Sequence, residues 1–313
     1  MKVAQAIALS NIFCVASMRL PANGLVDVVD TLESTSESSE SSASAGAVVA
    51  RSDMMDWTSM VTEAPDQGGF CNSCYVWASI GCLESRWALH KGWDKPKKIS
   101  AQQALDCVRM EHMNTVAGVR RKMTYRGTAN GCSKGEVRPV LEYAIDEGYV
   151  FEEDYLPYEI RGAKERDDSF NNNRAEQCQV DTDKIAIHPT AQEATVVNLN
   201  KANFERDAIE GLQTGPIAIG ISDTSFGMLE HKQNKEVTSN GGIAVRDCSD
   251  SAVSHAVLLV GYGEIDGVPY WKLRNSWGDK RYDNGFFKIP RGQNFCGAEN
   301  LGSYIKFNSN STQ

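Results

Sequence analysis

Three residues of the chain could together activate a thiol for attack on a carbonyl carbon: Cys74, His255 and Asn275. They lie in the runs QGGFCNSCYVWAS, SHAVLLVGYG and YWKLRNSWG, respectively. The thiolate is the reactive form of cysteine, and an imidazole within hydrogen-bonding reach can take the thiol proton. A side-chain amide can hold that imidazole in one tautomer and orientation. These residue types therefore predict acyl transfer through a covalent intermediate on Cys74.

Gln67 precedes Cys74 by seven residues and adds a further chemical group. The tetrahedral intermediate of acyl transfer carries a negative oxygen, which needs preformed hydrogen-bond donors. The Gln67 amide and the Cys74 backbone N–H could supply two of them. Each residue taken alone has a plainer interpretation, since His255 could be a core histidine and Asn275 a turn residue. The combination favours the catalytic interpretation.

Helices are predicted mainly in the first half of the chain. Apolar residues recur at helical spacing after Cys74, at Val76, Ile80, Leu83 and Trp87, and predict a buried helix from Ser73 to about His90. A thiol at its N-terminus would have a lowered pKa, because the positive end of the helix dipole stabilises the thiolate. Two more helices are predicted over 99–107, with Ser100 as N-cap, and over 136–148, closed by Gly148.

The second half contains short β-rich runs bounded by Gly, Pro and Asn, including GPIAIGIS, HAVLLVGYG and NGFFKIPRG. A helical first half followed by a β second half predicts an α+β fold with a cleft between two lobes. Cys74 would lie in the helical lobe and His255 in the β lobe.

Composition limits the class of protein. The chain has 313 residues, of which 41% are hydrophobic and 23% charged, and a net charge of −9. These proportions are typical of a globular protein. The acidic balance disfavours nucleic-acid binding, which needs a basic surface.

The N-terminal region differs from the rest of the chain. Residues 1–17 have one Lys, an apolar run and small residues at their end, and predict a secretory signal peptide. The alternative is a short buried or membrane-anchoring helix, although the run is short for a bilayer. Residues 18–51 include a low-complexity Ser/Glu stretch and predict a pro-segment or linker. We expect the folded domain over 52–313 and no membrane span in the mature protein.

Nine cysteines fit an oxidising compartment. Cys14 lies in the predicted signal and Cys74 is the candidate nucleophile, so seven others allow three disulfides and one free thiol, with the pairing open. Cys71 and Cys74 could instead form a redox or zinc pair. No second CxxC or His pair completes a metal site, so we expect neither metal nor cofactor.

At these residues the chain resembles the papain-like cysteine peptidases. The blocks that carry the resemblance are Gln67 to Tyr75, His255 to Gly263 and Asn275 to Gly278, within a similarity over roughly 52–305. It implies a papain-like two-lobe fold, with a helical lobe over about 70–180 and a β-barrel-like lobe over about 181–305. It also implies roles for the site residues: Cys74 as nucleophile, His255 as acid/base, Asn275 as orienting residue, Gln67 as oxyanion donor and Trp277 as the ring shielding the His–Asn pair.

The resemblance further implies three disulfides: Cys71–Cys132, Cys107–Cys178 and Cys248–Cys296. Cys82 would then be a buried free thiol. The resemblance, carried over residue by residue, also implies six substrate-binding positions: Gly135, Glu136, Val137, Ser254, Ala256 and Leu301. Leu301 would form the floor of the pocket for the P2 side chain, and an apolar floor favours Leu, Val or Phe there over Arg.

We expect a secreted or lysosomal cysteine endopeptidase. Exopeptidase action, as in dipeptidyl peptidase I-like or cathepsin X-like members, is an alternative suggested by Tyr75 and by the short segment before the domain. A second alternative is a catalytically weak homologue that acts as a binding protein. Expected partners are peptide or protein substrates, with cystatin-like inhibitors as candidates, and we expect a monomer.

Several positions depart from the family pattern. One extra residue lies between Gln67 and Cys71, and Asn72 and Lys134 stand where the family usually has Gly, on the wall of the S1 subsite. Residues 108–131 form a long basic insertion. We expect either a solvated surface loop or a loop bordering the non-primed side of the cleft, where it would limit substrates or bind an acidic partner.

Overall fold

The fold is described from a computed structural model. It describes residues 54–109, 129–158, 178–222, 232–247 and 252–308 in full, and the strand backbones of 111–116 and 119–124. The predicted signal, 1–17, and the Ser/Glu-rich segment, 18–51, lie outside the described residues. Across the described part of the chain, no helix is long and apolar enough to cross a bilayer.

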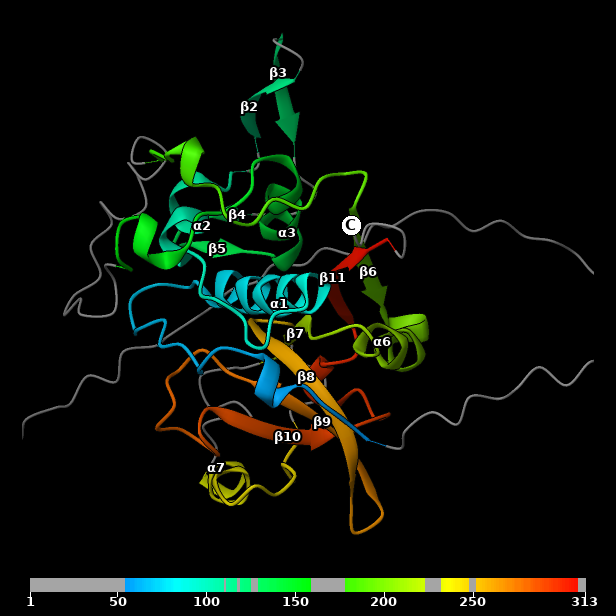
Figure 1. The fold of residues 1–313 in the computed structure, drawn as a ribbon. Coiled ribbons are helices and arrows are strands. Elements are labelled where there is room, and N and C mark those ends of the chain that lie inside the picture. The colour runs from blue at the N-terminus through cyan, green and yellow to red at the C-terminus, as the bar shows by residue number, and fades with distance from the viewer. Residues whose placement is uncertain are drawn as a thin grey trace, which may run out of the picture.

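The chain folds into helices and a large antiparallel sheet, which confirms the predicted α+β class (Figure 1). The helices are α1 (Cys74–Lys91), α2 (Ala101–Cys107), α3 (Val137–Asp146), α6 (Phe204–Leu212) and α7 (Lys232–Ser239). The strands are β1 (Met55–Asp56), β2 (Glu111–Val116), β3 (Val119–Thr124), β4 (Ala129–Asn130), β5 (Lys134–Gly135), β6 (Ala194–Asn200), β7 (Ile217–Ile221), β8 (His255–Ile265), β9 (Val268–Arg274), β10 (Phe286–Pro290) and β11 (Leu301–Phe307).

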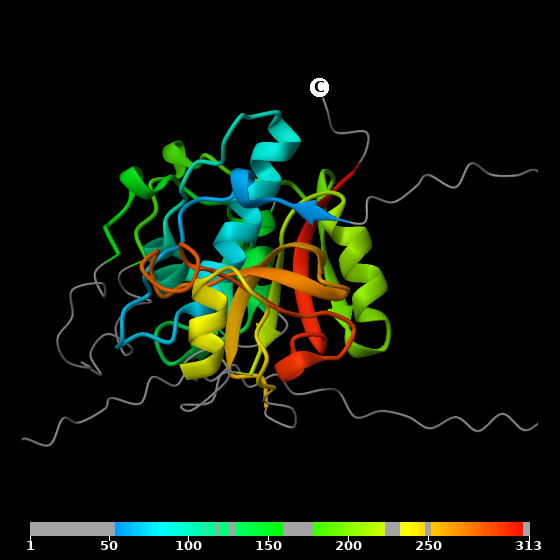
Figure 2. The same ribbon diagram turned by 90° about the horizontal axis from the view of Figure 1, so that it is seen from below.

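The large sheet has the strand order β10-β9-β8-β7-β11-β6, and β1 pairs with β8. Within the described residues β10 and β6 are its edges, so the expected barrel-like part is an open sheet and no closed barrel forms. Helix α1 packs against β7, β8 and β11 on one side and against α3 on another. Figure 2 shows α6 beside β11 at one end of the sheet.

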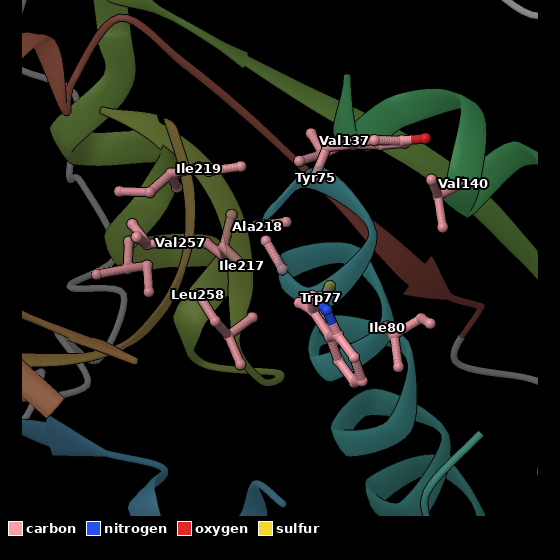
Figure 3. Close-up of a cluster of buried hydrophobic side chains, with 14 of the residues drawn as sticks. Tyr75, Trp77, Ile80, Val137, Val140, Ile217, Ala218, Ile219, Val257 and Leu258 are labelled. Carbon is pink, nitrogen blue, oxygen red and sulfur yellow. The ribbon is translucent and has the colours of Figure 1, made fainter. Parts of the chain in front are cut away.

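Helix α1 is the centre of the core, and its residues from Cys74 to Ala88 are all buried. In Figure 3, the labelled apolar side chains of β7 and β8 lie on one side of α1, and Val137 and Val140 of α3 lie on the other side, where Ile80 points. Burying each large apolar side chain contributes about 1.5–3 kcal/mol. The helix ends at Gly92, whose left-handed conformation (φ 65°) suits glycine.

The other predicted helices also form. Ser100 caps α2, because its hydroxyl accepts a hydrogen bond from the Gln103 N–H at 3.0 Å. Helix α3 covers most of the predicted 136–148 span, and Gly148 follows it with φ 78°.

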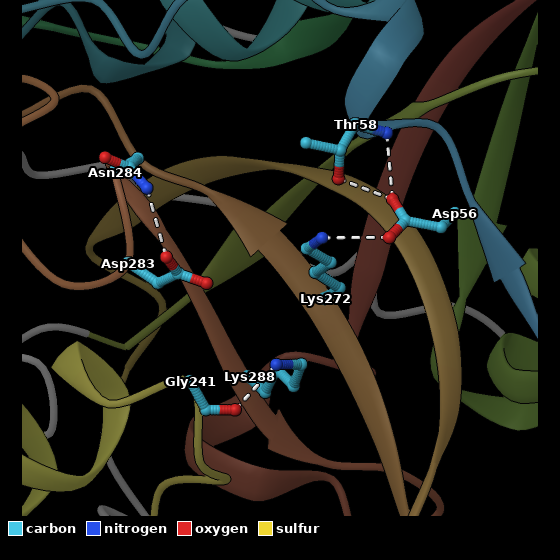
Figure 4. Close-up of polar contacts among 7 residues, drawn as sticks. All are labelled: Asp56, Thr58, Gly241, Lys272, Asp283, Asn284 and Lys288. Atoms are coloured by element: carbon cyan, nitrogen blue, oxygen red, sulfur yellow. Dashed lines mark hydrogen bonds and ion pairs between the residues drawn. The ribbon is translucent and has the colours of Figure 1, made fainter.

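Ion pairs and hydrogen bonds fasten the ends of the sheet, as Figure 4 shows. Lys272 of β9 pairs with Asp56 of β1 at 2.9 Å, and Asp56 also accepts bonds from Thr58. At the β10 edge, Lys288 donates to the Gly241 carbonyl oxygen at 2.6 Å, which ties the turn after α7 to the sheet. The first described residues are therefore held on the sheet that carries His255.

Two disulfides brace the helical part, Cys71–Cys132 and Cys107–Cys178, and both pairings are those that the resemblance implies. Cys82 is free and buried, as expected. Cys296 is disulfide-bonded, and Cys248, its implied partner, lies outside the described residues.

The basic insertion is not simply a loop. Strands β2 and β3 pair antiparallel from Glu111 opposite Thr124 to Val116 opposite Val119. Figure 1 shows this β2–β3 hairpin projecting from the end of the molecule that holds α2, α3, β4 and β5.

Candidate active site

The three predicted catalytic residues each lie at the end of a regular element. Cys74 is the first residue of α1, His255 is the first residue of β8, and Asn275 directly follows β9. Because α1 packs on β8 and β8 pairs with β9, one helix–sheet contact positions all three segments.

His255 and Asn275 form a buried pair. The imidazole Nε2–H donates to the Asn275 side-chain oxygen at 2.8 Å. The same oxygen accepts the Ser276 backbone N–H at 2.8 Å, which fixes the orientation of the amide. The Trp277 ring lies over the imidazole, with ring centroids 4.9 Å apart. The amide and the indole therefore leave the imidazole little freedom to rotate.

The second ring nitrogen of His255, Nδ1, is buried and has no hydrogen-bond partner among the described residues. Burial lowers the pKa of His255 to about 4, although the bond to Asn275 acts in the opposite direction. The neutral imidazole is therefore the stable form while no anion lies beside it. A neutral Nδ1 with no partner can accept a proton, and a neighbouring thiolate would raise the imidazole pKa.

Cys74 is fully buried and disulfide-bonded in this structure. A disulfide sulfur cannot act as a thiolate nucleophile. Any chemistry at Cys74 therefore requires prior reduction of this bond.

Gln67 is fully buried and held through both ends of its amide. Its Nε2 donates to the Cys71 carbonyl oxygen at 3.1 Å, and its Oε1 accepts the Ser276 hydroxyl at 2.6 Å. An amide NH₂ carries two protons, so one remains for another acceptor. The extra residue before Cys71 therefore does not prevent Gln67 from bonding to the loop that leads to Cys74.

Two residues that support this site were not identified from the sequence. Ser276 joins Gln67 to Asn275 through the bonds given above. The Tyr158 hydroxyl donates to the Gln67 carbonyl oxygen at 2.8 Å and lies 2.8 Å from the Ser73 hydroxyl. Only the position of Ser276 beside Asn275 could have indicated its role, because the contacts of Tyr158 are with residues distant in sequence.

The predicted substrate-binding residues in the helical part lie close to Cys74. Gly135 of β5 lies against the Tyr75 ring, and a Cβ at this position would be 2.3 Å from a ring carbon. Glu136 is the N-cap of α3, and Val137 is its first, buried residue. The Val137 carbonyl oxygen accepts the Ser79 hydroxyl of α1 at 3.0 Å. This segment is thus fixed to the helix that begins at Cys74.

Ala256 and Leu301 lie on one row across the sheet. Ala256 of β8 pairs with Gly220 of β7. Gly302 of β11 pairs with Ile219, so Leu301 is level with Gly220 on its other side. Residues opposite one another in antiparallel strands point to the same face, and two strand spacings separate Ala256 from Leu301 by about 10 Å. Gly220, between them, contributes no side chain to this row.

The sequence did not identify the place of Gly220 in this row. A glycine inside an apolar run such as IAIGI is a sign that another group approaches the backbone closely. Ser254, the remaining predicted pocket residue, is half-buried just before β8, where its N–H donates to the Ile221 carbonyl oxygen at 3.1 Å.

The two unusual residues at the expected S1 wall differ in their environment. Asn72 donates through its side chain to the Ser133 carbonyl oxygen at 3.1 Å and so joins the two segments around the Cys71–Cys132 disulfide. Lys134, which directly follows Ser133 in the chain, is exposed. Lys134 therefore places a positive charge beside Gly135.

A buried polar cluster lies under the site. Glu84 of α1 accepts the Ile99 N–H and the Thr62 hydroxyl, both at 2.8 Å. Burial raises the pKa of Glu84 to about 7, although the nearby Arg274 cation acts against this shift. Burial also lowers the pKa of Arg274, to about 10, and Glu84 opposes that change. The two charges therefore stabilise each other inside the protein.

Comparison with known proteins identifies the family. The model of the papain family cysteine proteases matches residues 51–306, so the chain belongs to this family. The resemblance inferred from the Cys74, His255 and Asn275 blocks is thereby confirmed.

Individual relatives are more distant. The chain is 29% identical over 259 residues to thiol protease aleurain of Arabidopsis thaliana, covering 82% of this chain and 60% of the relative. It is 29% identical over 255 residues to cathepsin S of Bos taurus, covering 80% and 64%. It thus spans about three fifths of the length of these two relatives.

Solved structures show the same fold. The structure of digestive procathepsin L 3 from Tenebrio molitor larval midgut matches with a TM-score of 0.61 at 26% identity, covering 83% of this chain and 71% of that chain. The match supports the papain-like arrangement of α1 against the sheet.

Proposed function

We propose that the protein is a cysteine endopeptidase with Cys74 as nucleophile. The buried His255–Asn275 pair is the observation that carries the proposal, because it leaves Nδ1 as a neutral base in a fixed orientation. After reduction of the Cys74 disulfide, Nδ1 takes the thiol proton and gives a thiolate–imidazolium pair. The first position of α1 favours the thiolate through the helix dipole.

The reaction then follows from these groups. The thiolate attacks the peptide carbonyl carbon, and the resulting oxyanion receives bonds from the second Gln67 Nε2 proton and the Cys74 N–H. When the C–N bond breaks, the imidazolium gives its proton to the departing amine. Water then attacks the thioester, His255 takes a proton from that water, and the released thiol completes the cycle.

The substrate would bind in an extended conformation beside Gly135, where the absence of a Cβ allows close approach. We expect the P2 side chain to lie over Gly220, between the apolar side chains of Ala256 and Leu301. A charged P2 side chain would lose its hydration there without gaining a partner. We therefore expect cleavage after Leu-Arg or Phe-Arg to exceed cleavage after Arg-Arg.

The protein's partners and location follow from the same proposal. Peptides and proteins are the substrates, cystatin-like proteins are candidate inhibitors, and the active form is a monomer. The cathepsins and plant thiol proteases among its relatives support a secretory or lysosome-like route.

Active-site labelling tests the proposal. The purified protein is treated with an epoxysuccinyl thiol-protease inhibitor with and without prior reduction, beside Cys74→Ala, and mapped by mass. We expect one adduct, on Cys74, only after reduction. Folded, reduced protein without an adduct would contradict a peptidase and favour a binding role.

Cleavage of peptides blocked at both ends then separates endopeptidase from exopeptidase action. An endopeptidase cleaves these peptides internally. An enzyme that needs a free terminus does not cleave them and would overturn the endopeptidase assignment.

A further inference from the structure

The β2–β3 hairpin is connected directly to the candidate substrate-binding strand. At its base, Arg109 forms a bridge with Asn130, and β4 pairs with β5 through Ala129 opposite Gly135. Gly135 in turn lies against Tyr75, the neighbour of Cys74. The hairpin therefore extends from the strand pair beside which the peptide substrate would bind.

The charge of this region is opposite to that of the whole protein. Residues 108–135 contain six Lys or Arg residues and one acid, Glu111, whereas the whole chain has a net charge of −9. Three of the cations, Arg120, Arg121 and Lys122, are consecutive in β3. Consecutive strand positions alternate between the two faces, so these three positions fall on both faces of the hairpin.

The residues that the strand register places opposite these three positions are uncharged. They are Thr115, Asn114 and Met113 of β2. Adjacent like charges repel one another, and an anionic ligand would relieve this repulsion. An acidic polypeptide would be repelled by most of the protein and attracted to this site.

We propose that the β2–β3 hairpin binds an acidic segment of the protein substrate, on the N-terminal side of the scissile bond. The proposal rests on the peptidase function. The exposed Lys134 beside Gly135 continues the positive charge toward the cleft. Acidic proteins would thus be selected by a surface separate from the P2 pocket.

The length of the hairpin sets the position of the acidic residues. Lys122 lies seven residues before Ala129. At about 3.4 Å per extended residue, this distance is at most about 24 Å, which an extended substrate covers with about seven residues. We therefore expect recognition of acidic residues within about nine positions before the scissile bond.

The test compares blocked fluorogenic peptides that carry four Glu or four Gln residues in this upstream region, using the reduced full chain. The hairpin variant is R120Q/R121Q/K122Q. The matched control, K201Q/K232Q/K235Q, removes the same charge from exposed lysines elsewhere, two of them in or at the start of α7. A blocked dipeptide substrate reports basal activity.

We expect the wild type and the control to cleave the Glu peptide about 3- to 10-fold more efficiently than the Gln peptide at low ionic strength. The hairpin variant should lose this preference but cleave the dipeptide normally. About 0.5 M salt should remove the preference from the wild type and the control. An unchanged preference in the hairpin variant would overturn the proposal. Glu residues placed after the scissile bond that raise cleavage equally would also overturn it. The same holds if the hairpin variant loses binding of a sulfated polysaccharide but keeps the preference for the Glu peptide.

Failure of the proposed peptidase function would be recognised separately, because the dipeptide would then remain uncleaved by the wild type. Fluorescence anisotropy of the Glu peptide with Cys74→Ala protein would still decide the inference. If the hairpin substitutions abolish binding of the Glu peptide to Cys74→Ala protein, the inference is supported. If Cys74→Ala protein binds the peptide equally with and without these substitutions, the inference is contradicted.

Discussion

Nη2 of Arg274 donates to the Trp77 carbonyl oxygen at 3.3 Å and so joins β9 to α1. Arg274 directly precedes Asn275, and Trp77 follows Cys74 by three residues. Nη1 of the same guanidinium donates to the carbonyl and hydroxyl oxygens of Thr62, both at 2.9 Å. This buried cation thus fixes the two segments that carry the proposed nucleophile and the residue that orients its base.

Replacing Arg274 by Met should therefore weaken the fold. The substitution removes the guanidinium bonds to Thr62 and Trp77 and the cation near buried Glu84, and we expect the free energy of unfolding to fall by about 3–5 kcal/mol. Denaturant unfolding in a Cys74→Ser background measures the loss without self-digestion. The double variant E84Q/R274M should lose less than R274M alone. Strictly additive losses would show that the two side chains are not coupled.

The stability conferred by Glu84 should depend on pH. The pKa of Glu84 is raised from its ordinary value of 4.5 to about 7, so the folded state favours the protonated carboxyl. The stabilisation is complete below about pH 4.5 and is lost as the pH rises through 7. We expect the stability of wild type minus that of E84Q to fall by about 1–3 kcal/mol between pH 5 and pH 8.

His255 changes the total stability in the opposite direction, since its lowered pKa favours the folded state as pH rises from about 4 to 6.5. Comparing E84Q with the wild type cancels this contribution. A difference that does not change with pH, measured by thermal unfolding, would mean that Glu84 titrates normally.

Asn275→Ala should lower kcat about 10- to 100-fold with little effect on KM, because the imidazole loses the bond that fixes its tautomer and orientation. The pH profile of kcat/KM should change as well, since Asn275 also supports the protonated imidazole. Asn240→Ala, at an exposed position, is the control. An unchanged pH profile with raised KM would assign Asn275 to substrate binding.

The sequence predicted the elements whose signals are local. Apolar spacing located α1, and Ser100 marked the start of α2 within one residue. The β2–β3 hairpin was missed because its strands mix Met and Val with Arg, Lys and Asn, so the alternation of apolar and polar residues is weak. Two residues, one of them Gly118, separate its strands, and that spacing is the signal that was available.

The candidate site shows the same limit. Cys74, His255 and Asn275 could be identified because their side chains carry reactive or polar groups. The position of Gly220 between Ala256 and Leu301 depends on strand register, and a glycine has no chemistry to draw attention to it. The bonds of Tyr158 to Gln67 and Ser73 join residues more than 80 positions apart, which no local pattern records.

Gly135→Ala should impair substrate binding. The new Cβ would lie 2.3 Å from the Tyr75 ring, whose hydroxyl is fixed by a 2.9 Å bond to the Gly131 carbonyl oxygen. Because the ring cannot yield, β5 must move, and we expect KM to rise about 10-fold. Ser133→Ala, on the same segment, should leave KM unchanged. Unaltered kinetics of Gly135→Ala would place the substrate elsewhere.

Leu301→Glu should change the P2 preference from apolar toward basic residues. Leu301 is half-buried and level with Gly220, so a carboxylate there would face the proposed pocket. In a partly desolvated pocket it would pair with a P2 Arg, and we expect kcat/KM for Arg-Arg substrates to rise about 10-fold while Leu-Arg substrates lose a similar factor.

The neutral variant Leu301→Gln separates charge from polarity. It should lose the apolar preference without gaining the basic one. For Leu301→Glu the gain should disappear below about pH 4.5, where the new carboxylate becomes protonated. If Leu301→Glu and Leu301→Gln behave alike at neutral pH, the side chain at 301 does not face the P2 residue, and the row through Gly220 is not the specificity pocket.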